Sequence, residues 1–219
     1  MKDLDFDLMR KRMVDEQLTV RDIADRDVLD AFLKVPRHRF VAKEYLESSY
    51  ADHPLPIGNN QTISQPYIVA LMTQCLDLGG RTGRVLEVGT GSGYQTAVLA
   101  ELAAEVYSVE RIAELADKAT RILNELGYRN VTIKVGDGSL GWQEHAPYDG
   151  IIVTAAAPRI PASLIEQLKD GSRLVIPVGG TYGQVLTIAE KRGASLKTTS
   201  VCGCVFVPLV GAEGWQEER

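Results

Sequence analysis

The sequence contains few of the residues on which disulfide-rich and metal-binding proteins depend. Of its 219 residues, three are cysteines and three are histidines. The cysteines are too few for a disulfide framework, and neither residue type shows ligand spacing, so no metal site is expected. Cys202 and Cys204 alternate along a strand-like stretch, which favours two core thiols on one face over a redox or metal-binding pair.

Long apolar runs and an excess of positive charge are also lacking. No run is long enough to span a bilayer, and the charged N-terminus has no apolar leader, so we expect a cytoplasmic protein without a membrane partner. The formal net charge is −5 and the pI about 5.3, which argues against a nucleic-acid partner, because such proteins usually carry a basic surface. The composition and length are typical of one α/β domain.

A glycine-rich turn between a predicted strand and a predicted helix is the strongest feature that is present. Residues 85–88 are apolar or β-branched apart from Glu87, three alternating glycines begin at Gly89, and residues 96–102 have a helical pattern. Such turns hold nucleotide-like ligands, because glycine lets a ligand approach the backbone. The G-x-G-x-G spacing differs from the dinucleotide fingerprint, and a Glu87 carboxylate would repel phosphate. S-adenosylmethionine, which carries adenosine but no phosphate, is therefore the candidate cofactor.

Two further acids follow predicted strands. Glu110 ends the strand predicted at residues 106–110, about twenty residues past the first glycine, where an acid can accept both ribose hydroxyls. The alternative is a solvated glutamate at a strand end. Asp137 lies between two glycines after the strand predicted at residues 131–135, and we expect it to hold the adenine amino group.

Strand and helix patterns alternate between residues 85 and 178, which predicts a doubly wound, mostly parallel sheet with helices on both faces. The chain should form one domain in three parts: a helical cap with an active-site loop at 1–80, a cofactor-binding core at 81–180 and an antiparallel β element at 181–219. Helices are expected at 3–20, 25–34, 67–76, 112–126 and 160–168, and later strands at 148–153, 174–178, 184–190 and 198–207.

The polar stretch at residues 52–66 is rich in turn formers, and it is predicted to be a loop. Ser64 is the expected N-cap of the following helix, with Pro66 in its first turn. Because this stretch precedes the glycine-rich strand, it should lie over the cofactor pocket. An ordinary surface loop is the alternative.

Two stretches of the chain, residues 61–70, QTISQPYIVA, and residues 86–94, LEVGTGSGY, resemble family motifs. The first resembles the signature of the protein-L-isoaspartate O-methyltransferases, and the second matches that family's form of the methyltransferase cofactor loop. The resemblance covers nearly the whole chain. Further matches lie at residues 35–37, 54–58, 136–138, 154–158, 174–179 and 206–209. Asn60 departs from the family, in which many members have glycine, but asparagine tolerates a left-handed backbone and the turn is expected to persist.

The resemblance implies a Rossmann-like methyltransferase fold and transfer of a methyl group from S-adenosyl-L-methionine to the free α-carboxylate of L-isoaspartyl residues in damaged proteins and peptides. The ester then collapses to a succinimide, which allows return to aspartyl, and S-adenosyl-L-homocysteine is the other product. Ser64 takes the position of the active-site serine. The expected cofactor-binding residues are Ile63, Gln65, Glu87, Gly89, Thr90, Gly91, Ser92, Glu110, Arg111, Asp137 and Gly138. The expected substrate-binding residues are Thr62, Ser64, Val205 and Val207.

This chemistry needs no strong base, because a carboxyl with a pKa of roughly 4 is already ionised at neutral pH. None of the three histidines lies in a recognisable partner motif, and no G-x-S-x-G elbow surrounds Ser64. Its hydroxyl should therefore orient the acceptor and not attack it. An extended substrate peptide is expected to pair with the backbone near Ile63 and at residues 205–207.

Three other interpretations of the sequence remain open. A nicotinamide dehydrogenase would share the glycine turn and Glu110, a small-molecule or RNA methyltransferase would share the cofactor half, and a non-catalytic binding module could share the fold. The residues at 62–66 and the acidic composition favour the repair enzyme. We expect a monomer, with a small oligomer as the alternative.

Overall fold

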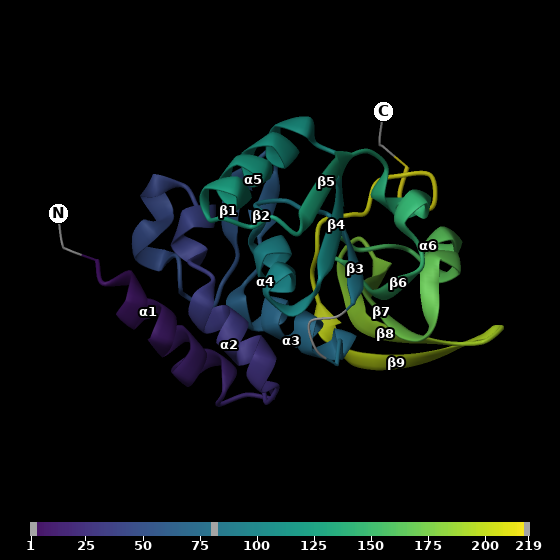
Figure 1. Cartoon of the computed structure of the whole chain (residues 1–219), viewed down its shortest axis with the longest axis horizontal. Helices are drawn as coiled ribbons and strands as arrows, with labels where there is room; N and C mark the ends of the chain where they lie inside the picture. The colour runs from purple at the N-terminus through teal and green to yellow at the C-terminus, as the bar shows by residue number, and fades with distance from the viewer. Residues whose placement is uncertain (1–3, 80–82, 217–219) are drawn as a thin grey trace.

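The centre of the molecule is a seven-stranded sheet in the order β5-β4-β3-β6-β7-β8-β9 (Figure 1). The computed structural model describes residues 4–79 and 83–216. The first five strands in this order run parallel, β8 pairs antiparallel with β7, and β9 pairs antiparallel with β8. The bounds are β3 (Arg84–Val88), β4 (Glu105–Glu110), β5 (Val131–Val135), β6 (Tyr148–Val153), β7 (Leu168–Gly180), β8 (Gly183–Arg192) and β9 (Ser195–Cys204). The predicted parallel sheet with an antiparallel end is confirmed.

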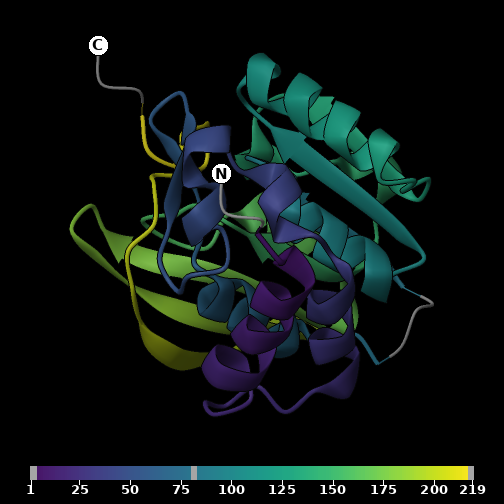
Figure 2. The ribbon, with the colours of Figure 1, turned by 90° about the vertical axis from the view of Figure 1, so that its left-hand side faces the viewer.

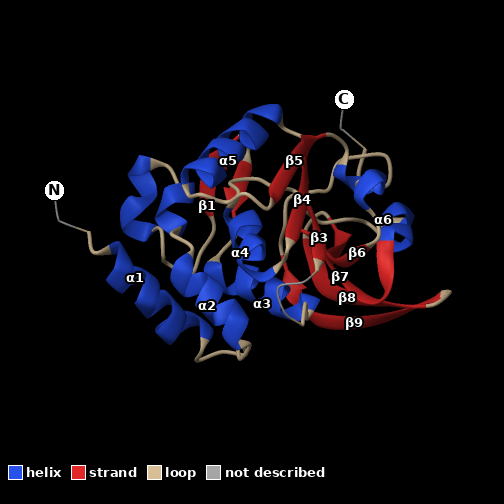
Figure 3. Ribbon diagram, in the orientation of Figure 1, coloured by secondary structure: helices blue, strands red, loops and turns tan. Residues whose placement is uncertain are grey.

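Helices cover both faces of this sheet (Figure 3). Alternate strand residues face opposite layers. Val85 packs in the layer of helices α2 to α5, whereas Leu86 packs in the layer that contains α6. The helices are α1 (Phe6–Met13), α2 (Arg26–Lys34), α3 (Pro66–Leu76), α4 (Tyr94–Leu102), α5 (Ala113–Glu125) and α6 (Ala162–Gln167). A strand flanked by two apolar layers explains why the β3 sequence is almost continuously apolar.

The N-terminal helices form the predicted cap, which lies at the purple and blue end of the chain (Figure 2). α1 continues into a wider π turn at Val14–Leu18, so the predicted helix at 3–20 is largely confirmed. The Asp25 carboxylate accepts hydrogen bonds from two amides of the first turn of α2, which confirms it as the N-cap. That helix ends at Lys34, since the residue before Pro36 is held extended.

The stretch predicted as a loop at residues 52–66 contains a small hairpin, β1 (Leu55–Gly58) and β2 (Gln61–Ile63). Asn59 and Asn60 turn it with φ of 52° and 55°, so Asn60 does adopt the left-handed backbone. The periodicity of this stretch is hidden because its strands are only four and three residues long.

Two predicted boundaries near the site are wrong. Ser64 is not the N-cap of α3: Gln65 holds that position without a side-chain bond, and the distant Asp52 carboxylate accepts from the Tyr67 amide. The last strand ends at Cys204, because residues 205–207 leave β8, and the Phe206 amide donates to the Gln184 side chain.

Candidate active site

The site lies where the strand order reverses, at the carboxyl ends of the parallel strands. From β3 the chain proceeds through β4 to β5 on one side and then through β6 to β7 on the other. Open α/β sheets bind ligands at this point, because the loops that leave neighbouring strands diverge there. The glycine turn after β3 and the loop after β6 therefore border one cavity.

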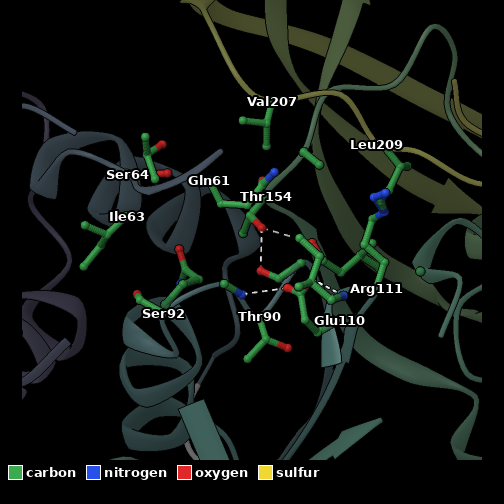
Figure 4. A pocket seen from close by; sticks show the side chains of 18 of the residues that line it. Gln61, Ile63, Ser64, Thr90, Ser92, Glu110, Arg111, Thr154, Val207 and Leu209 are labelled. Carbon is green, nitrogen blue, oxygen red and sulfur yellow. Dashed lines mark hydrogen bonds between the residues drawn. The ribbon is translucent and has the colours of Figure 1, made fainter. Parts of the chain in front are cut away.

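This cavity has a volume of about 1020 Å³ with its open mouth included, a size that suits a drug-sized ligand. Figure 4 shows Ser64 and Ile63 on one side, Glu110 and Arg111 on the other, and Thr154 between them. Expected site residues in its lining are Thr62, Ile63, Ser64, Gly89, Thr90, Gly91, Ser92, Glu110, Arg111, Gly138 and Val207. The fold thus brings together segments that lie up to about 145 residues apart, as the separation of Thr62 and Val207 illustrates.

The glycine turn exposes backbone to the cavity, because its conformation excludes side chains. Gly89 has φ of 95°, and a Cβ there would collide with the Thr154 hydroxyl. That hydroxyl donates to the Gly89 carbonyl at 2.6 Å, which ties the loop after β6 to the turn after β3. Gly93, with φ of 88°, then opens α4.

Glu110 reaches the cavity from the end of β4, as predicted. It is 5 % exposed, and its two carboxylate oxygens accept from the Gly91 amide at 2.8 Å and the Ile112 amide at 2.9 Å. A carboxylate has about four acceptor positions. The two amides thus fix its orientation and leave capacity for two ligand hydroxyls.

Glu87 is buried beneath the glycine turn and does not line the cavity. Its side chain leaves β3 toward α4, where one oxygen accepts from the hydroxyls of Thr96 and Ser108 at 2.6 Å each. Burial raises the pKa of this carboxyl to about 8, so the neutral form is favoured at neutral pH. The expectation that a Glu87 carboxylate faces the ligand is therefore corrected. The side chain connects to the site through Ser108, whose hydroxyl is 2.6 Å from that of Thr90.

Three other expected residues also lie outside the cavity lining that the described residues form. Asp137 accepts from the backbone and hydroxyl of Ser139 and from the Ala212 amide, so its carboxylate anchors the C-terminal segment. Gln65 is at the start of α3. Val205 is 77 % exposed, since it directly follows the end of β9.

Ser64 lies between β2 and α3, on the side of the cavity opposite Glu110. Its carbonyl accepts a hydrogen bond from the buried Arg37 guanidinium at 2.8 Å. None of the histidines in the described residues lines the cavity with it: His38 is 2.9 Å from the Tyr50 hydroxyl, and His145 stacks on Tyr107. The Ser64 hydroxyl therefore lacks the histidine base that a serine nucleophile needs.

The sequence did not single out several residues that complete the cavity. Thr154 and Ala155 follow β6, and their place after a parallel strand is a signal that could have identified them. The others come from the hairpin, the ends of β3 and β4, the turn after β4, the helices α3 and α4 and the C-terminal segment. Several lie in stretches that resemble the family, but no pattern in the residues themselves gives them a role in the site. They are Gln61, Val69, Met72, Val88, Tyr94, Gln95, Val109, Ile112, Pro208, Leu209 and Val210.

The described ranges, 4–79 and 83–216, contain no group of three or more histidine, cysteine or acidic residues placed to hold a metal ion. No helix in these ranges has both the length and the apolar character required to cross a membrane.

The family model for Protein-L-isoaspartate(D-aspartate) O-methyltransferase (PCMT) matches residues 9–214. A protein-L-isoaspartate O-methyltransferase of Geobacter metallireducens is 56 % identical, over 99 % of this chain and 100 % of the relative. Another, from Syntrophus aciditrophicus, is 55 % identical over 96 % of this chain and 97 % of its own.

Solved structures agree with these matches. A protein-L-isoaspartate O-methyltransferase superposes with a TM-score of 0.85 and 30 % identity, over 94 % of this chain and 67 % of that one. A structure from Plasmodium falciparum in complex with S-adenosyl-L-homocysteine has a TM-score of 0.79 and 24 % identity, over 94 % and 98 % of the two chains, and it supports the fold. The fold and the enzyme class that the sequence predicted are confirmed, and the dehydrogenase interpretation is set aside. The chain belongs to the protein-L-isoaspartate(D-aspartate) O-methyltransferase family.

Proposed function

We propose that the cavity holds S-adenosyl-L-methionine and an isoaspartyl residue side by side, and that in this way the chain carries out the repair methylation of its family. The observation that carries this proposal is that Ser64 and Glu110 line the same cavity from opposite sides. One lies in the segment that carries the family signature, and the other ends the strand next to the glycine turn. The cavity thus has a side for the acceptor and a side for the methyl donor.

The donor side fits S-adenosyl-L-methionine. Glu110 has acceptor capacity for the two ribose hydroxyls, and the exposed backbone of Gly89 and Gly91 allows the ligand to approach closely. Gly138 lines the cavity beyond β5, where a Cβ would lie 2.5 Å from the Val88 side chain, and it is placed to receive the adenine. When bound, S-adenosyl-L-methionine supplies a methyl group on a sulfonium, which an ionised carboxylate accepts without a base.

The acceptor side orients the isoaspartyl α-carboxylate. The Ser64 hydroxyl has no hydrogen-bond partner within the described residues, and it can donate to one carboxylate oxygen. Thr62 and Val207 both line the cavity, and the Val207 carbonyl already accepts from the Ala156 amide. We propose that an extended peptide lies between β2 and residues 207–210 and is held mainly through its backbone. Val205 would contact only the flanking residues of the substrate.

Positioning is the main contribution of the protein in this proposal. Holding the reacting atoms about 3–3.5 Å apart in line can supply several kcal/mol of the barrier reduction. The β1–β2 hairpin covers the cavity, and the Asn59 side-chain Nδ2 donates to the Glu114 carboxylate on α5 at 3.2 Å, which brings the hairpin against the cofactor side. This cover also limits the access of water.

The decisive experiment is transfer of labelled methyl from S-adenosyl-L-methionine to a peptide that contains one isoaspartyl residue. The control is the same peptide with aspartyl at that position. We expect labelling of the isoaspartyl peptide alone, and labelling that the peptide carboxyl loses in mild base, as an ester does. Equal labelling of both peptides, or of neither, would contradict the proposal and favour a different acceptor or a non-catalytic module.

The proposal extends to the state of the enzyme. We propose a cytoplasmic monomer in which residues 1–80, 81–180 and 181–219 act as one domain, without a metal ion and without a nucleic-acid partner. Light scattering after size-exclusion chromatography tests the monomer. Activity that persists after treatment with a chelator tests the metal independence.

A further inference from the structure

Arg37 is a fully buried cation that contacts both sides of the active site. It begins the short 3-10 helix Arg37–Phe40 of the cap. Its Nε donates to the Ser49 carbonyl at 2.8 Å, and its Nη2 donates to the Ser64 carbonyl at 2.8 Å. The guanidinium carbon lies 4.8 Å from the centre of the Tyr94 ring, on the first residue of α4.

The surroundings of Arg37 are not those of a stabilising ion pair. In the described part of the chain no carboxylate lies within salt-bridge distance of it, although the Asp52 carboxylate, which pairs with Arg21, favours its charged form from further away. Its Nη1 has no hydrogen-bond partner. Burial lowers its pKa to about 10, so it stays charged at neutral pH. A buried charge without a counter-ion is costly, and such groups are often kept for structural specificity and not for stability.

The contact with Ser64 occurs where the backbone lacks regular pairing. Ser64 follows the last residue of β2 and precedes the N-cap of α3, so neither element fixes it. Tyr94, on the other side of Arg37, directly follows Gly93 of the glycine turn and lines the cavity. Phe32 and Phe40 pack edge-on against the same ring and hold it in place.

We propose that Arg37 is a positioning residue for methyl transfer, which fixes Ser64 relative to the cofactor turn by holding the Ser64 carbonyl while it stacks on Tyr94. Arginine suits this role because its planar fork donates in two directions and its face stacks on an aromatic ring, whereas lysine offers one point charge. A displacement of about 1 Å at a reacting group can lower a rate roughly 100-fold. This inference rests on the proposed function of Ser64.

The test combines Arg37→Met with Ser64→Ala. Arg37→Met should lower kcat for an isoaspartyl peptide about 10-fold or more, because the Ser64 hydroxyl is misplaced. Its Kd for S-adenosyl-L-homocysteine should stay within about 3-fold, because Arg37 lies behind Tyr94 and does not itself line the cavity. In the Ser64→Ala background the same substitution should lower kcat by less than about 3-fold, since the group that Arg37 positions is already lost. Arg39→Met is the matched control, because Arg39 lies in the same short helix but forms an exposed pair with Glu125; its kcat should equal that of the wild type.

Other outcomes would overturn the inference. An unchanged kcat in Arg37→Met would overturn it. An equal loss of kcat in the wild-type and Ser64→Ala backgrounds would also overturn it, because a general weakening of the fold produces that result. If Arg37→Met fails to fold, Arg37→Lys decides: it keeps the charge, and a kcat equal to that of the wild type would refute the need for the fork.

A readout without turnover separates this inference from the proposed function. Hydrogen–deuterium exchange with S-adenosyl-L-homocysteine bound should be faster at residues 61–65 in Arg37→Met than in the wild type, and unchanged in α6. If the wild-type enzyme fails to label the isoaspartyl peptide, the proposed function fails. Unchanged exchange at residues 61–65 refutes the role of Arg37 whatever the acceptor is.

Discussion

Replacing Glu87 with glutamine should change how the stability of the protein depends on pH. The native carboxyl is completely buried, one oxygen accepts from Thr96 and Ser108, and the other has no partner. Burial raises its pKa from 4.5 to about 8, with a smaller contribution from the charge of Glu110. In the unfolded chain the carboxyl ionises near its ordinary value. Between these two values the native state therefore holds a proton that the unfolded state has lost.

The sign and size of the effect follow from this difference in bound protons. The contribution of the Glu87 proton to the free energy of unfolding is complete below pH 4.5. It decreases as the pH rises and is lost once the pH exceeds about 8. One pKa unit corresponds to about 1.4 kcal/mol, so the unfolding free energy should fall by at most about 5 kcal/mol across this window. Glutamine cannot ionise, but it leaves buried N–H groups unpaired, which costs about 1–3 kcal/mol at every pH.

We therefore expect wild type to be the more stable protein at pH 5, and Glu87→Gln to close or reverse the gap by pH 8. Urea unfolding of both proteins between pH 5 and pH 9, followed by circular dichroism, measures the difference. All other titrating groups cancel in that difference, because the two chains differ at one position. A difference that stays constant within about 0.5 kcal/mol from pH 5 to pH 8 would refute the reasoning and show that Glu87 is ionised in the native state.

Three further predictions concern the cavity and the C-terminal segment that borders it. Ser64→Ala should lower kcat about 10- to 100-fold while the calorimetric Kd for S-adenosyl-L-homocysteine stays within a few-fold. A large loss of binding would place Ser64 among the cofactor ligands. Ser195→Ala on β9 is the matched control. Glu110→Gln should weaken S-adenosyl-L-homocysteine about 10-fold, because neutral acceptors make weaker hydrogen bonds than charged ones; unchanged affinity would remove Glu110 from the ribose site. Asp137→Ala should speed hydrogen–deuterium exchange at residues 210–215, because the Ala212 amide loses its acceptor, and unchanged exchange would show that the anchor lies elsewhere.

The sheet and the cofactor side could be predicted because their signals are local. β3, the glycine turn and Glu110 lie within about 25 consecutive residues, and strand–helix alternation fixes their relation in space. Gly138 was assigned to the cofactor through the family resemblance, and it lines the cavity after β5. The acceptor side was found through a resemblance, since no pattern in residues 61–65 specifies chemistry.

Prediction failed where the fate of a polar side chain depends on distant partners. Glu87 precedes the turn in sequence, but the alternation along β3 sends it toward α4, to hydroxyls 9 and 21 residues away. The Asp137 carboxylate accepts a hydrogen bond from the Ala212 amide, 75 residues later in the chain. The sequence around each carboxylate does not reveal these distant partners. A carboxylate close to glycines was therefore predicted to bind the ligand.

The buried groups beneath the site explain how its donor and acceptor sides keep a fixed position relative to each other. Glu87, through Ser108, holds the turn that bears Thr90, and Arg37 joins the Ser64 carbonyl to the first residue of α4. Both groups are buried at an electrostatic cost, and neither touches the cavity. Hydrogen-bonded groups of this kind allow little displacement of the segments that they join. A buried polar group that loses its partner finds no water to replace it, which is costly. The methyl donor and acceptor thus owe their alignment to polar contacts one layer behind the cavity, and substitutions in that layer should alter turnover more than cofactor affinity.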